Sequence, residues 1–89
     1  MTPQSFPQVN THFGPPLDMS DEQVATIPAF RGQIQSGSCT GHNVVVVAWR
    51  PSEYELAEMK AGKPVFISML GGLAPHFLTT DFTAALNPA

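Results

Sequence analysis

Charge is scarce in this chain of 89 residues. Only 12% of its residues are Asp, Glu, Lys or Arg, about half of the roughly 25% that soluble domains usually carry. Four basic residues against seven acidic ones give a formal net charge of −3, which argues against the basic surface that binds a nucleic-acid backbone. A surface with so few charges stays in solution through polar side chains or is hidden by self-association. We therefore expect a homo-oligomer and no nucleic-acid partner.

Cysteine and long apolar runs are also scarce. Cys39 is the only cysteine, so the chain cannot form an internal disulfide, which agrees with a reducing compartment. The longest apolar run, from Val44 to Trp49, has six residues, far fewer than the roughly 20 that a membrane-spanning helix needs. The first residues lack the basic start and apolar stretch of a signal peptide. We therefore expect a cytoplasmic protein with no membrane partner.

Proline is concentrated at the N-terminal end. Residues 1–19 hold four prolines, and each fixes its own φ, removes a hydrogen-bond donor and biases the preceding residue toward extended conformations. This composition predicts an extended arm over residues 1–19 and a single domain over residues 20–89. Phe6, Val9 and Phe13 recur too often for a solvated tail, so the arm is expected to pack along the core or along a neighbouring subunit.

A capping box predicts a helix over residues 52–61. The Ser52 side chain can accept from the backbone of Glu55, whose own side chain can accept from the backbone of Ser52. Gly62 is placed to end this helix. Its apolar residues are expected to form a stripe that lies on a sheet. They are Tyr54, Leu56, Ala57 and Met59.

The remaining pattern predicts strands joined by glycine-rich turns. A further capping box at residues 20–23 predicts a short helix that Pro28 ends. The Gly, Ser and Thr residues of segment 36–42 predict a hairpin loop. The pair Gly71 and Gly72 predicts a tight turn. The tail from residue 83 is a short helical turn or a frayed end. The predicted strands cover residues 29–35, 43–49, 64–70 and 73–82.

Segment 43–49 is expected to be the centre of the sheet. Its four consecutive valines do not alternate with polar residues, which indicates a strand covered on both faces. Trp49 either packs into the core, the interpretation we favour, or offers a stacking surface. The pattern as a whole predicts a small α+β domain with a mainly antiparallel sheet of about four strands, one capped helix and an extended arm.

No catalytic or metal-binding motif stands out. Cys39 and His42 lie three residues apart, a spacing that a metal or an activated thiolate could use. A second pair of ligands at suitable spacing is missing, and a glycine-rich turn explains the loop without catalysis. Segment 37–41 lacks the Gly-Lys-Ser/Thr end of a phosphate-binding loop. We therefore assign no catalytic residue, no metal and no cofactor.

Polar and aromatic residues that flank the apolar strands are the candidates for ligand or partner binding. Each also has a structural interpretation, such as core packing for the tryptophan or a backbone-bonded imidazole for the histidines. The candidates are His12, Arg31, Gln33, Trp49, Arg50 and His76.

Four short stretches of the sequence are distinctive: FGPP in the arm, VVVVAWRP, ELAEMKAG and GGLAPHFLTT. Together they resemble a family of short, mostly uncharacterised proteins encoded by bacteriophages and prophages. The resemblance covers roughly residues 10 to 82. It implies expression in the cytoplasm of a bacterial host and carries no established activity or functional residue.

These observations together favour a phage accessory protein that acts by stoichiometric binding. The leading hypothesis is counter-defence, in which the protein sequesters a nucleotide signal or occupies a host defence protein. An alternative is a component of the virion or of its assembly, whose arm clasps neighbouring subunits. A third is a small enzyme that uses Cys39, His42 or His76.

Overall fold

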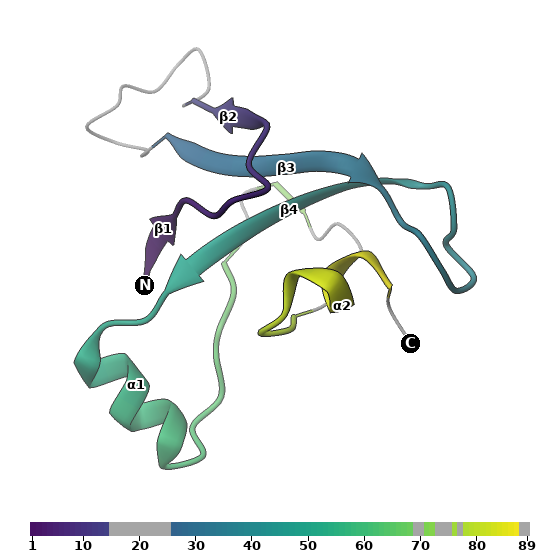
Figure 1. Ribbon diagram of the computed structural model, residues 1–89. Coiled ribbons are helices and arrows are strands. Elements are labelled where there is room, and N and C mark those ends of the chain that lie inside the picture. Colours follow the sequence, from purple (N-terminus) through teal and green to yellow (C-terminus); the bar gives the residue numbers. More distant parts are fainter. Residues whose placement is uncertain (15–25, 69–70, 73–75, 77, 88–89) are drawn as a thin grey trace.

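The computed structural model describes residues 1–14, 26–68, 71–72, 76 and 78–87 (Figure 1). Four antiparallel strands form one sheet in the order β1-β4-β3-β2, which confirms the predicted α+β class. The elements are β1 (Thr2–Gln4), β2 (Thr11–Phe13), β3 (Ile27–Gln33), β4 (Asn43–Arg50), α1 (Glu53–Lys60) and α2 (Phe82–Leu86). Neither of these helices has the length and apolar content to cross a membrane.

The central feature is the hairpin of β3 and β4. Its register places Phe30 opposite Val46. The loop closes through two backbone bonds, from the Ile34 N–H to the His42 carbonyl and from the Gly41 N–H to the Ile34 carbonyl, each 2.9 Å long. Gly41 has a φ of 86°, a left-handed conformation that glycine adopts at little cost. The predicted hairpin loop over residues 36–42 is therefore confirmed.

The described part of the arm forms both edges of the sheet. β1 pairs with the end of β4, where Pro3 lies opposite Trp49, and β2 pairs with the start of β3, where His12 lies opposite Pro28. Proline lacks the N–H that a central ladder needs, and an edge strand tolerates it. The arm thus packs along the chain's own core, which was one of the two expected arrangements.

Two of the predicted strands are wrong where the structure describes them. Residues 64–68 form no strand, and residue 82, the last of the segment 73–82, begins a helix. The physical reason is that β1 and β2 already occupy the sheet edges that these segments would need. The predicted helix that starts at residues 20–23 lies outside the described residues, and Pro28 belongs to β3.

α2 closes one face of the sheet and defines a small core. The Phe82 ring lies 5.8 Å from the Phe6 ring and 5.3 Å from the Phe30 ring, centroid to centroid, the latter edge-on. The Gln35 N–H donates to the carbonyl of Leu86 at 2.8 Å, which ties the end of α2 to the end of β3. Among the described residues, the hydrophobic side chains that are buried are Ala29, Ile34 and Leu86.

Glycine has a specific place beside Phe30. A Cβ built on Gly32 would lie 2.6 Å from two ring atoms of Phe30, two residues earlier on the same strand. The aromatic ring therefore covers the space that a side chain would take. This contact offsets the weakening that a glycine normally causes inside a strand.

The predicted helix over residues 52–61 is confirmed with its caps. The Glu55 N–H donates to the Ser52 hydroxyl at 3.1 Å, and the Ser52 N–H donates to the Glu55 carboxylate at 2.9 Å. At the other end Gly62, with φ 88°, donates to the Met59 carbonyl, and the next N–H donates to the Glu58 carbonyl. This pair of bonds is the Schellman arrangement that ends helices at a glycine.

The expectation that α1 lies on the sheet is wrong. None of its residues is buried, and it projects beyond the end of β4 (Figure 1). Its four apolar side chains lie at steps of two, one and two residues, and at about 100° per residue they spread around the helix instead of forming one stripe. A helix without an apolar face has little to gain from packing on a sheet.

Candidate functional site

The strand register divides the side chains of the sheet between two faces. Residues paired across antiparallel strands point to the same face. Because Val45 pairs with Arg31 and Val47 with Ala29, these side chains share one face, which we call the open face. Its members are Pro3, Thr11, Phe13, Ile27, Ala29, Arg31, Gln33, Asn43, Val45, Val47 and Trp49.

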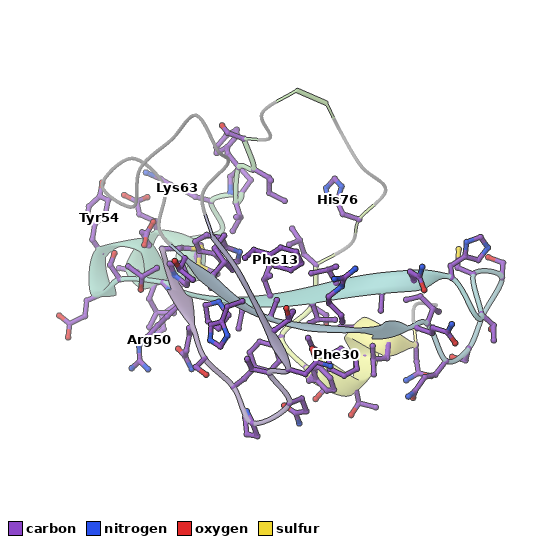
Figure 2. All side chains as sticks on the ribbon, turned by 90° about the horizontal axis from the view of Figure 1, so that it is seen from above. Phe13, Phe30, Arg50, Tyr54, Lys63 and His76 are labelled. Atoms are coloured by element: carbon purple, nitrogen blue, oxygen red, sulfur yellow. The ribbon has the colours of Figure 1, made fainter. Side chains whose placement is uncertain are left out.

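The open face is apolar and largely accessible to solvent. Val45 is 50% exposed, Trp49 47% and Phe13 40%, and Val47 is also exposed. Val44 and Val46, which point to the other face with Phe30, are half-buried. Figure 2 shows Phe13 and Phe30 on opposite sides of the ribbon of β4. α2 therefore covers one face. On the open face Phe13, Val45, Val47 and Trp49 remain exposed, whereas Ala29 is buried.

Two predictions about the central strand are corrected by this arrangement. β4 is central in the strand order, as predicted, but its side chains are half-buried on one face and exposed on the other. Trp49 lies on the exposed face, so the favoured prediction that it packs into the core is wrong. The reason is that, among the described elements, α2 is the one that packs on the sheet, and it packs against Phe30 on the other side.

The predicted binding residues do not converge on one site. Arg31, Gln33 and Trp49 belong to the open face. His12 pairs with Pro28 and Arg50 pairs with Thr2, which assigns both to the opposite face. Figure 2 places His76 well apart from Arg50. The set is thus divided between the two faces of the sheet.

A hollow of about 310 Å³ lies near the hairpin end of the open face. It contains one cation, the Arg31 guanidinium, whose central carbon lies 6.0 Å from the centre of the Phe13 ring. Ligand pockets usually measure about 300–1,000 Å³ and bring several polar groups together. This hollow is at the lower limit and offers a phosphate one charged donor. Its lining residues are Arg31, Gly32, Gln33, Asn43, Val44 and Val45.

The carboxylates of α1 have structural partners. The amino group of Met1 lies 2.7 Å from the Glu55 carboxylate and, with the Ser52 N–H, lowers the pKa of Glu55 to about 2. The ammonium of Lys63, followed by the Tyr54 hydroxyl, lowers the pKa of Glu58. The bond to Glu58 in turn raises the pKa of Tyr54. These groups hold the helix in place and do not form an acid and base pair around a cavity.

The loop that holds Cys39 and His42 is a solvent-exposed turn. The His42 N–H donates to the Cys39 carbonyl at 3.0 Å, and the Thr40 hydroxyl donates to the Gly37 carbonyl at 2.7 Å. In the part of the chain that the structure describes, no three His, Cys, Asp or Glu side chains are grouped for a metal ion. The geometry of this loop is explained by its turn.

The exposed apolar residues were missed by the sequence interpretation. Along β4 exposed and half-buried residues alternate, but the sequence does not show this alternation because valine occupies positions on both faces. Phe66 lies on a segment that was predicted to be a strand and is 88% exposed. Comparisons with protein-family models, curated proteins and solved structures found no match to this chain.

Proposed function

We propose that this protein acts by stoichiometric binding to another protein. The observation that carries the proposal is the distribution of the large apolar side chains in the described part of the chain, most of which face solvent. Contiguous exposed apolar surface on a small domain is typical of an interaction site. The exposed large hydrophobic residues of the described chain are Met1, Phe13, Val45, Val47, Trp49, Tyr54, Leu56, Met59, Val65, Phe66, Ile67 and Leu78.

The surface that suits a target protein is formed by α1 and the segment after it. We call it the helix surface. Its exposed apolar side chains are spread around α1 and along the segment that follows, and they are Tyr54, Leu56, Met59, Val65, Phe66 and Ile67. Tyr54 is 75% exposed and Phe66 88%. Projecting aromatic side chains are the groups that most often anchor protein interfaces.

Charge complementarity indicates what kind of protein would bind there. The whole chain has a net charge of −3, although two carboxylates of α1 are already paired, Glu55 with the Met1 amino group and Glu58 with Lys63. A target with an apolar recess and a basic rim would match this surface, because opposite potentials speed association and exclude wrong partners. A nucleotide target is less well supported, since the hollow beside Arg31 holds one cation.

The resemblance to phage proteins supplies the biological setting of the proposal. In that setting the protein acts in the cytoplasm of a bacterial host and occupies a host defence protein. The virion alternative has less support, because the arm strands β1 and β2 pair with the chain's own sheet instead of reaching a neighbour. The enzyme alternative has less support because the Cys39 loop is explained as a turn.

The test is a purification from bacterial cells followed by reconstitution. A host protein that co-purifies should bind the purified chain in a fixed ratio, and Tyr54→Ala with Phe66→Ala should weaken binding at least about 100-fold, as loss of interface anchors does. Leu78→Ala, a truncation of another exposed apolar residue, is the matched control and should bind normally. Binding that survives the double substitution would overturn the proposed surface. A bound nucleotide seen by native mass spectrometry would overturn the proposed target.

A further inference from the structure

The single chain exposes far more surface than a compact domain of its size. Its accessible surface is 7052 Å², whereas a folded monomer of 9.6 kDa is expected to expose about 5,100 Å². Its radius of gyration is 14.4 Å, compared with about 12 Å for a compact chain of this length. The excess of about 2,000 Å² is more than twice the roughly 800 Å² that each partner contributes to a standard interface.

The open face is suited to pair with a copy of itself. A two-fold interface uses the same patch on both subunits, so the patch must be complementary to itself. Apolar surface meets this condition without matching charges. Among the described strand residues that form the open face, Arg31 is the one that carries a charge. Its guanidinium lies over the Phe13 ring near the hairpin half of the sheet. Val47 and Trp49, farther along β4, are uncharged, so this part of the face can meet its copy without repulsion between like charges.

We propose that a second copy of this chain packs its open face against the first, sheet on sheet. In such packings the two sheets lie about 10 Å apart and their inner side chains form a shared core. Val45, Val47 and Trp49 would supply that core, while Val44 and Val46 stay with the chain's own Phe30 and α2. The four consecutive valines then have both faces covered. The open face and the helix surface share no residue, so dimer formation and binding of a target protein can be tested independently.

Trp49 is the only tryptophan, which makes the proposal measurable without a label. Analytical ultracentrifugation between roughly 1 and 100 μM, a range that brackets ordinary dimer affinities, should give twice the chain mass of 9.6 kDa. Dilution to the monomer should shift the Trp49 emission to longer wavelength as the indole meets water. A monomer at every concentration would overturn the proposal. If its Trp49 emission were also that of a buried indole, the chain's own residues would be the occupant of the open face.

A charge on the open face is the matched perturbation. Val45 is 50% exposed in the single chain, so Val45→Lys should leave the monomer folded. In the pair it would bury an uncompensated charge, and the dissociation constant should rise at least about 100-fold. Val65→Lys, at a similarly exposed position off the sheet, is the control and should dimerise normally. Dimers of unchanged affinity for Val45→Lys would place the interface elsewhere and overturn the proposal.

Discussion

Asn10 should be an unusually important surface residue. Its amide nitrogen donates to the Arg31 carbonyl at 3.0 Å, and its Oδ1 accepts from the Arg31 N–H at 2.8 Å. The side chain therefore continues the ladder of β2 along β3 by one more residue. Two net hydrogen bonds contribute about 0.5–1.5 kcal/mol each, and solvent exposure favours the lower half of that range. Asn10→Ala should lower the free energy of unfolding by about 1–2 kcal/mol.

The assay is thermal unfolding at one fixed protein concentration. For a chain of this length each kcal/mol lowers Tm by about 4–8 °C. Asn10→Asp keeps the acceptor for the Arg31 N–H but places a second carboxylate oxygen against the Arg31 carbonyl, so it should also lower Tm. Asn43→Ala, at another exposed amide, is the control and should leave Tm nearly unchanged. Equal losses for Asn10→Ala and Asn43→Ala would refute the reasoning, as would unaltered hydrogen exchange at the Arg31 amide.

Three further predictions concern the ends of the helices and the core. Phe82→Ala removes two ring contacts of about 0.5–1.5 kcal/mol each and part of the apolar burial, so urea unfolding should show a loss of about 2–4 kcal/mol. The pKa of Glu55 lies near 2 instead of 4.5. The stability that its carboxylate contributes is therefore complete above about pH 4.5 and is lost as the pH falls toward 2. Glu55→Gln should flatten the acid side of a curve of unfolding free energy against pH. Gly62→Ala places a side chain at φ 88° and should cost about 1–2 kcal/mol, whereas Gly14→Ala, with open space around it, should be neutral by the same thermal assay.

The elements that local chemistry determines were predictable from the sequence. The helix at residues 52–61 is specified by Ser52, Glu55 and Gly62, which are close in the chain and need no tertiary partner. The hairpin loop at 36–42 is specified in the same way by glycines with positive φ. Such signals depend on bonds that close within a few residues, and sequence patterns contain them.

The elements that depend on distant partners were not predictable. β1 and β2 have three residues each and exist because β4 and β3 offer them edges. Residues 64–68 have a strand-like composition but no free edge. The prediction that the candidate residues form one binding site was wrong for a related reason. Proximity of Arg31 or Trp49 to an apolar strand does not say which face each one occupies, and a shift of one residue changes the face.

The strand order has a consequence for the time course of folding. The segment that is synthesised first supplies both outer strands, whereas the hairpin they flank is complete only at Arg50. Residues 2–4 and 11–13 therefore leave the ribosome without partners and must wait for about 40 more residues, several seconds at bacterial rates of synthesis. During that interval the prolines of the arm limit its pairing with other chains. The first part of the protein to be made therefore cannot take its place until more than half of the chain has been synthesised.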